Sequence, residues 1–198
     1  MNRVRRTLTR AAADLRAVGR PFALVGGFAV SVRTEPRTTR DVDFVVAVAG
    51  DADAERLVAD LVGRGYAIIT AIEQVAVGRL ATVRLASPGG SVVDLLFASS
   101  GVEAEIVAGS QELTVVRGVR LAVPRVGDLI ALKVLSRDDA ARPQDRVDLA
   151  ALLAVAAPEE LTRARHTLEL ISTRGFDRGK DLVAELDRAG AELSPSPK

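Results

Sequence analysis

A short run of the sequence, DVDFVVAV, places two carboxylates at the start of a segment that is otherwise apolar. The apolar residues from Val42 to Val48 predict a buried strand. Side chains two residues apart in a strand point to the same face, so Asp41 and Asp43 would project together. Adjacent carboxylates repel each other and raise each other's pKa unless a cation lies between them. The pair therefore either caps the strand and forms salt bridges, or binds a cation.

A third carboxylate, Asp94, lies inside the apolar segment SVVDLLFA, for which we expect another buried strand. A lone charge in such a strand is costly unless it is paired or bound to a metal. If this strand runs beside that of Asp41 and Asp43, the three carboxylates converge, as a two-metal site for phosphoryl or nucleotidyl transfer requires. Carboxylate ligands suit a hard ion, Mg²⁺ or Mn²⁺. The alternative is that Asp94 pairs with one of the many arginines and that the other two form a solvated strand end.

Two glycines, Gly26 and Gly27, follow a short apolar strand and open a helix. Backbone N–H groups at the start of a helix, with no Cβ to obstruct them, bind phosphate well. Ser31, on the following turn, is a further candidate for phosphate contact, and Arg40 lies between the glycines and the carboxylates. A tight strand-to-helix turn explains the glycines equally well, and Arg40 could form a simple surface ion pair.

The hydrophobic pattern divides the chain into three parts. Residues 1–123 mix predicted helices and strands and indicate an α/β (α+β) core, whereas residues 124–190 read as helices. Residues 191–198 end in a segment rich in Pro and Ser that we expect to be disordered. The predicted helices are 2–18, 28–33, 52–64, 127–137, 146–156, 158–172 and 178–189, with Asp177 as the cap of the last. The predicted strands are 22–25, 42–48, 66–72, 80–86, 92–98, 113–116 and 119–123.

Composition excludes several kinds of site. The chain has no Cys and only one His, His166, which rules out disulfides, Cys-ligated zinc and a multi-His metal site. Lys+Arg 27 and Asp+Glu 26 give a net charge of +1, without the excess of a dedicated nucleic-acid binder. No run is long enough to span a membrane, and the basic N-terminal segment lacks the apolar region of a signal peptide. We therefore expect a cytoplasmic protein with no membrane partner.

Together, these residues resemble the motif of the nucleotidyltransferase superfamily: a Gly-Gly or Gly-Ser turn, a spacer, and a T-x-D-x-D-like pair. In GGFAVSVRTEPRTTRDVDFVV the motif is matched by Gly26, Gly27, Thr39, Asp41 and Asp43. The arginine-rich spacer and RTTRDVDFVV resemble in particular the AbiEii/AbiGii-type branch, which comprises the nucleotidyltransferase toxins of type IV toxin–antitoxin pairs.

A second segment, DLIALKVLSRDDAARPQDRVDLAALL, resembles another motif of that branch, K-x-x-x-R followed by K/R-x-x-D-x-x-D-L. The matching residues are Lys133, Arg137, Arg142, Asp145 and Asp148. Taken without the resemblance, Lys133 borders an apolar helix face and could simply extend its ammonium group into solvent. The two aspartates, i and i+3 on one helix, could pair with nearby arginines instead of a metal.

The resemblance implies a fold and a set of roles. The fold would be a small mixed sheet flanked by helices, with a helical C-terminal part. The metal ligands would be Asp41, Asp43 and Asp94, and the groups near the triphosphate would be Gly26, Gly27, Arg40 and Lys133. Asp148 would lie at the edge of the active-site cleft in a supporting role.

We therefore expect a nucleotidyltransferase that uses Mg²⁺ (or Mn²⁺) to move an NMP from an NTP to an acceptor hydroxyl. As a toxin of a toxin–antitoxin pair it would act on tRNA or protein, and a cognate antitoxin would be a possible partner. Two other functions stay open: modification of a small molecule such as an aminoglycoside, and a catalytically silent module that binds or regulates. A cleft with basic walls would favour RNA, whereas a closed acidic pocket would favour a cationic drug.

Overall fold

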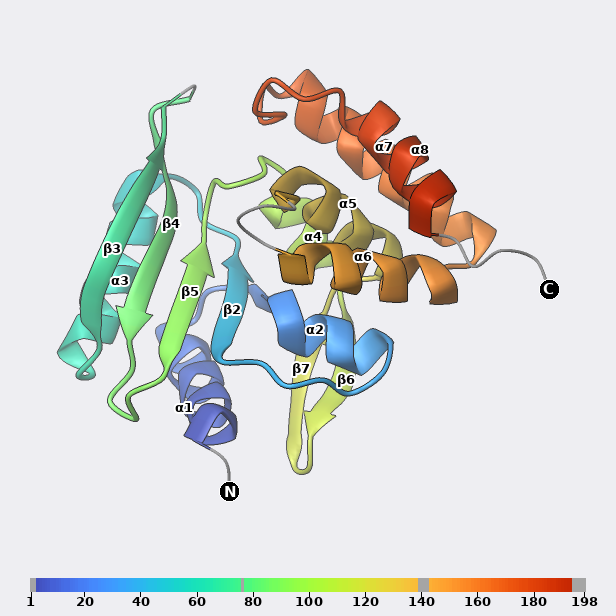
Figure 1. Ribbon diagram of the computed structural model, residues 1–198. Helices are drawn as coiled ribbons and strands as arrows, with labels where there is room; N and C mark the ends of the chain where they lie inside the picture. The colour runs from blue at the N-terminus through green and yellow to red at the C-terminus, as the bar shows by residue number, and fades with distance from the viewer. Residues whose placement is uncertain (1–2, 76, 139–142, 194–198) are drawn as a thin grey trace.

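The computed structural model describes residues 3–75, 77–138 and 143–193. Over these residues helices and strands alternate as far as β3, three strands follow one another from β3 to β5, and the elements after β7 are helices (Figure 1). The helices are α1 (Arg3–Val18), α2 (Gly26–Arg33), α3 (Asp51–Gly63), α4 (Glu103–Gly109), α5 (Val126–Ser136), α6 (Pro143–Val155), α7 (Pro158–Thr173) and α8 (Leu182–Leu193). The strands are β1 (Phe22–Val25), β2 (Asp41–Val46), β3 (Ala67–Gln74), β4 (Arg79–Ala86), β5 (Val92–Leu96), β6 (Gln111–Val116) and β7 (Val119–Val123).

Five of the strands form one mixed sheet in the order β1-β2-β5-β4-β3. Strand β2 runs parallel to β5, and the other neighbours in this sheet are antiparallel. A parallel pair needs a long connection between its strands, and α3, β3 and β4 supply it here. Strands β6 and β7 form a separate hairpin that turns at Arg117 and Gly118. The predicted fold class, a mixed α/β domain with a helical C-terminal part, is confirmed.

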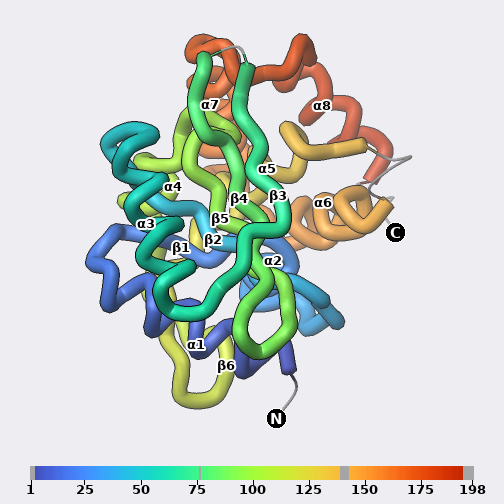
Figure 2. The backbone as a smooth tube through the Cα atoms, turned by 90° about the vertical axis from the view of Figure 1, so that its left-hand side faces the viewer, coloured from blue at the N-terminus to red at the C-terminus, as the bar shows by residue number. Residues whose placement is uncertain are grey.

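The two faces of the sheet pack against different helices, as the alternation of side chains along β2 shows. Phe44 points into a cluster with Leu8 of α1 and Leu57 of α3. The next residue, Val45, points to the other face and belongs to a cluster that includes Ile130 of α5 and residues of α2, α4, α6, α7 and α8. Figures 1 and 2 show α7 and α8 at the opposite end of the molecule from α1. Because the second cluster also contains residues of β1, the C-terminal helices share a core with β1 and β2.

Close packing between α5 and α7 joins the C-terminal helices to one another. A Cβ atom on Gly127 of α5 would overlap the backbone of α7 and lie 2.9 Å from Cβ of Arg163. The N–H of Gly127 donates to the Glu160 carboxylate at 2.6 Å. Within the described residues, none of the helices is long and apolar enough to cross a membrane.

Helix α4 is absent from the predicted elements, because its seven residues are too few to show a helical repeat of apolar positions. Its first residue, Glu103, is buried and accepts hydrogen bonds at one carboxylate oxygen from the backbone N–H groups of Ser99 (2.7 Å) and Ser100 (2.6 Å). The side chain thus stabilises the turn before the helix.

The start of α8 differs from the prediction. We expected a helix from residue 178 capped by Asp177, but Arg178 and Gly179 both have positive φ angles, which a right-handed helix excludes. The helix begins at Leu182, and the Asp181 carboxylate accepts the N–H of Ala184 at 3.1 Å, as an N-cap does. Residues 191–193, which we assigned to the tail, continue α8, and residues 194–198 lie outside the described part of the chain.

Candidate active site

The three predicted carboxylates meet at the central parallel pair of strands. The register of β2 and β5 pairs Asp43 with Asp94, so the two side chains stand side by side on one face of the sheet. Asp41 lies two residues earlier on β2 and projects to the same face. One carboxylate oxygen from each of the three lies within 4.8 Å of the other two. Segments far apart in the sequence thus bring three negative charges together.

Crowding and burial act most strongly on the middle carboxylate. Asp43 keeps some contact with solvent, yet burial is the first cause of its raised pKa, which reaches about 7. The charges of Asp41 and Asp94 contribute to the rise, and those of Lys133 and Arg84 only partly offset it. Without a bound cation, Asp43 is thus partly protonated at neutral pH.

The donor set fits a hard divalent ion. All three candidate ligands are carboxylates, which Mg²⁺ and Mn²⁺ prefer, and neither Cys nor His is among them. A divalent ion between the oxygens would replace the mutual repulsion that raises the pKa of Asp43 by attraction. Asp41, Asp43 and Asp94 are therefore the described residues that could hold Mg²⁺ or Mn²⁺.

Gly26 makes room for Asp43. Val25, the last residue of β1, is the register partner of Asp43, and the chain turns directly into α2 at Gly26 with φ +62°. A Cβ atom on Gly26 would overlap the Asp43 carboxylate and lie 2.6 Å from its Cγ. Both the left-handed backbone and the close approach therefore require glycine at this position.

Gly27 makes room for an arginine that the sequence analysis did not select. A Cβ atom on Gly27 would lie 2.6 Å from Nη2 of Arg37, so this guanidinium group stands against the first turn of α2. The signal in the sequence was weak, because Arg37 is one of two arginines in the loop between α2 and β2 and its partner lies far along the chain. The two glycines thus serve different neighbours.

That partner is Asp148 of α6, whose side chain is completely buried. Nη2 of Arg37 donates to one oxygen at 2.7 Å, and Nε lies 2.7 Å from the other oxygen without aiming its N–H at it. Lys133 of α5 lies 2.8 Å from the same carboxylate, and Gln144 donates to it at 3.2 Å. Burial raises the pKa of Asp148, but these hydrogen bonds and charges outweigh burial and leave the pKa below its usual value.

Lys133 also pairs with Asp145. The ammonium donates to the Asp145 carboxylate at 2.6 Å, and Ser136 donates to the other oxygen of that group at 3.0 Å. Three residues of the second motif therefore meet at one place, where Lys133 pairs with both aspartates and Arg37 pairs with Asp148. Arg137 pairs with Glu192 of α8 at 3.1 Å. Arg142, also selected from this motif, lies outside the described residues.

Arg84 of β4 is the second residue near the site that the sequence analysis did not select. It is the register partner of Asp94 and donates to both carboxylate oxygens, from Nε at 2.8 Å and from Nη2 at 2.7 Å. The hydrogen bonds that Arg84 donates to Asp94 are the largest cause of the raised pKa of Arg84. We expected Asp94 either to join the other carboxylates or to pair with an arginine. In the structure it does both.

The remaining candidates lie in or beside the loop between α2 and β2. The Ser31 hydroxyl donates to the Gly27 carbonyl at 2.9 Å and accepts the Arg37 N–H at 3.3 Å, so it is occupied within this loop. Thr39 donates to the carbonyl of Asp41 at 2.9 Å and supports the start of β2. Arg40 is exposed. Phosphate contact by Ser31 and Arg40 stays a prediction.

The sequence profile of the family described as "Nucleotidyl transferase AbiEii toxin, Type IV TA system" matches residues 7–195. The chain belongs to the AbiEii family. The match confirms the resemblance carried by the two motifs, and this AbiEii-family protein is a nucleotidyltransferase. A search of curated proteins found no match.

Several solved structures are similar to this chain at low identity. An antigenic nucleotidyltransferase-like protein from Paracoccidioides brasiliensis is 18% identical, with 93% of this chain and 92% of that chain covered and a TM-score of 0.51. The enzyme ANT(2")-Ia in complex with adenylyl-2"-tobramycin is 15% identical, with 92% and 95% covered and a TM-score of 0.49. Lincomycin-bound lincosamide adenylyltransferase LnuA is 13% identical, with 75% and 96% covered and a TM-score of 0.48.

Proposed function

We propose that this AbiEii-family protein is a Mg²⁺- or Mn²⁺-dependent toxin that transfers an NMP from an NTP to a hydroxyl of tRNA or protein. One observation carries the metal-dependent chemistry: three carboxylates converge on neighbouring parallel strands, directly beside the glycine turn that opens α2. The toxin role is inferred from the description of the family.

The carboxylates would hold the metal, and the turn would face the phosphates. Asp41, Asp43 and Asp94 would be the ligands, and a bound divalent ion would neutralise charge on the phosphates during transfer. The N–H groups of Gly26 and Gly27 at the start of α2 would bind the triphosphate, because a helix N-terminus favours negative charge.

The cations of the loop and of α5 would complete the phosphate site. Lys133 has three N–H donors and uses two on Asp145 and Asp148, so a third is left for a phosphate oxygen. Arg37 stands against the turn at Gly27, and we add it to the expected set of Arg40 and Ser31. Asp148 would hold Arg37 and Lys133 in place in a supporting role.

The transfer step would be an in-line displacement at the α-phosphorus. The acceptor oxygen would form a bond to this phosphorus while the bond to the β-phosphate oxygen breaks and pyrophosphate leaves. Asp94 would help to remove the proton of the acceptor hydroxyl. Its place on β5, on the side of Asp43 away from the Val25–Gly26 turn, supports this role, because it leaves the phosphates to the α2 side.

The proposal places the reaction in the cytoplasm, where NTPs and tRNA are found, and includes a cognate antitoxin that restrains the enzyme. A test is the transfer of label from each α-³²P NTP in turn, with Mg²⁺ and either total tRNA, lysate protein or an aminoglycoside as acceptor. Asp43→Asn is the inactive variant. Asp60→Asn, at an exposed position on α3, is the matched control.

We expect label on RNA or protein with the wild type and the Asp60 variant, none with the Asp43 variant, and growth arrest on expression that follows the same order. Label on the aminoglycoside alone would replace the toxin proposal with drug modification. No transfer from any NTP, together with no Mg²⁺-dependent NTP binding, would mean that this chain is a silent form of the fold.

A further inference from the structure

Both oxygens of Asp94, a candidate metal ligand, are already held by a protein cation. Arg84 donates to Oδ1 at 2.8 Å and to Oδ2 at 2.7 Å, a two-point contact that matches the shape of a carboxylate. The contact follows from strand register, which sets the two residues directly opposite each other on β4 and β5. Asp41 and Asp43 have no such partner among the hydrogen bonds and ion pairs of the described residues, apart from the hydrogen bond that Thr39 donates to the Asp41 backbone.

A metal ion on Asp94 would come close to Arg84. Mg²⁺ binds a carboxylate oxygen at about 2.1 Å. An ion on either oxygen of Asp94 would then lie no more than about 5 Å from the guanidinium nitrogen bound to that oxygen. Two positive groups at this separation repel each other, most strongly where protein atoms exclude water. Asp94 can therefore bind Arg84 or a metal ion but not both, unless another negative group binds next to them.

The side chain of Arg84 is exposed enough to turn away from Asp94. About 46% of its side-chain surface is exposed, against 9% for Asp94. Among the described residues, its guanidinium donates to Asp94 and to no other group. An NTP at the site would bring the negative charge that lets Arg84 turn from Asp94 to a phosphate oxygen, since guanidinium binds both groups well.

We propose that Arg84 is a positioning residue that competes with a metal ion for Asp94 and gives up this carboxylate only when a nucleotide is bound. The inference rests on the proposed metal-dependent function and adds an order of events to it. The nucleotide-free protein holds one ion, on Asp41 and Asp43. The second ion binds at Asp94 after the phosphates have drawn Arg84 away.

The rival explanation is a purely structural ion pair that supports a buried aspartate. The two explanations differ in sign. If Arg84 competes with the metal, its removal strengthens metal binding without nucleotide and weakens nucleotide binding. If it only supports Asp94, its removal leaves a disordered carboxylate and weakens both.

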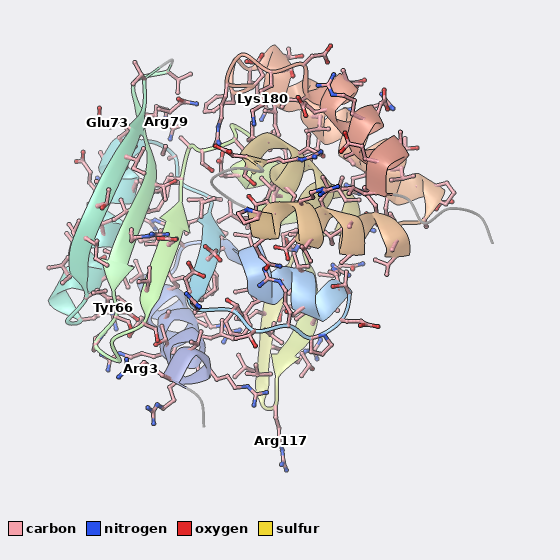
Figure 3. The ribbon with its side chains drawn as sticks, viewed as in Figure 1. Arg3, Tyr66, Glu73, Arg79, Arg117 and Lys180 are labelled. Atoms are coloured by element: carbon pink, nitrogen blue, oxygen red, sulfur yellow. The ribbon has the colours of Figure 1, made fainter. Side chains whose placement is uncertain are left out.

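The experiment counts bound Mn²⁺ by electron paramagnetic resonance, first without nucleotide and then with a non-hydrolysable NTP analogue. The variants are Arg84→Gln, which removes the charge, and Arg84→Lys, which keeps the charge but cannot hold both oxygens. The matched control is Arg79→Gln, on the same strand. Arg79 stands at the hairpin end of β4, well away from the middle of the strand (Figure 3), and pairs with Asp51 at 3.3 Å.

Without nucleotide, we expect two ions in Arg84→Gln. We expect one ion in the wild type, in the Arg79 variant and in Arg84→Lys, whose charge still repels a second ion. For the nucleotide analogue, we expect an apparent Kd about tenfold weaker in Arg84→Gln, equivalent to one charge-assisted hydrogen bond. Two ions in the nucleotide-free wild type would overturn the inference. Weaker Mn²⁺ binding in Arg84→Gln would also overturn it, as would a second ion in Arg84→Lys, because the retained charge would then not exclude the metal.

Failure of the inference can be told apart from failure of the proposed function. If the wild type binds Mn²⁺ with nucleotide and transfers label, but Arg84→Gln binds Mn²⁺ as it does, only the role of Arg84 is wrong. If the wild type binds no Mn²⁺ under either condition and transfers no label, the proposed function falls and the inference falls with it. Thermal unfolding of each variant confirms that the compared proteins are folded.

Discussion

Asp43 of β2 and Asp94 of β5 stand directly opposite each other on two parallel strands, and the only covalent link between them runs through α3, β3 and β4. Like charges directly opposite each other on neighbouring strands destabilise a sheet. A chain that keeps both aspartates therefore carries a local cost that a cation or a proton on Asp43 relieves, and this cost can be measured.

The first prediction concerns the pH dependence of stability without metal. Asp43 has a pKa of about 7 in the folded protein, above its value in an unfolded chain, so the folded state binds this proton more tightly. The contribution of Asp43 to stability is therefore highest at acidic pH and is lost as the pH rises through about 7. Urea unfolding in EDTA at pH 5.5 and pH 8 should show a lower free energy of unfolding at pH 8. Asp43→Asn should reduce this difference and Asp60→Asn should not.

The second prediction concerns added metal. Mg²⁺ binds the ionised carboxylates, so it should raise the melting temperature of the wild type more at pH 8 than at pH 6. The raised pKa of Asp43 is the reason, because metal must displace a proton at the lower pH. Differential scanning fluorimetry with and without Mg²⁺ measures the shift. An equal shift in Asp43→Asn would show that the stabilising ion binds elsewhere.

The third prediction concerns Gly26→Ala. The alanine Cβ would overlap the Asp43 carboxylate, and φ +62° disfavours an L-residue by about 1–2 kcal/mol. We expect loss of stability on that order and a fall in transfer activity of at least about tenfold, since a displaced ligand costs more than 1.4 kcal/mol of binding. Gly63→Ala on α3, whose added Cβ meets nothing within 4 Å, should retain both properties.

The fourth prediction concerns Asp148→Asn. Removing the buried carboxylate leaves Arg37 and Lys133 without a shared counter-ion, which should cost about 3 kcal/mol of stability. Both cations should then be less well placed for phosphate, so the KM for NTP should rise. Urea unfolding and steady-state kinetics measure the two effects. Asp187→Asn, in an exposed pair with Arg165, should change neither, and similar losses in both variants would argue against a special role for Asp148.

The fifth prediction separates two possible caps of α8. The Asp181 carboxylate accepts the N–H of Ala184, so Asp181→Ala should lower the free energy of unfolding by about 1 kcal/mol. Asp177 accepts the N–H of Gly179 in the preceding turn, and Asp177→Ala should cost less. The reverse order of the two losses would support a helix that begins at residue 178.

Local patterns in the sequence were sufficient to find most elements and the first members of the site. Apolar runs predicted β1, β2, β4 and β5 to within two residues, because burial of a strand depends on consecutive residues. The spacing of Asp41 and Asp43 predicted a shared face for the same reason. Helix α4 and the start of α8 escaped prediction, because a short helix has little periodicity and two residues with positive φ leave no clear mark in composition.

The sequence by itself therefore determined the α/β character of the chain, the family and the two aspartates that begin β2. Only the tertiary structure decided that Asp94 faces Asp43, that Arg84 holds Asp94, and that Asp148 pairs with Arg37 and Lys133. It also decided that the two glycines make room for different side chains. The physical reason is that these contacts join segments whose separation in the chain is bridged by sheet order, strand register and helix packing, none of which a local pattern of residues encodes.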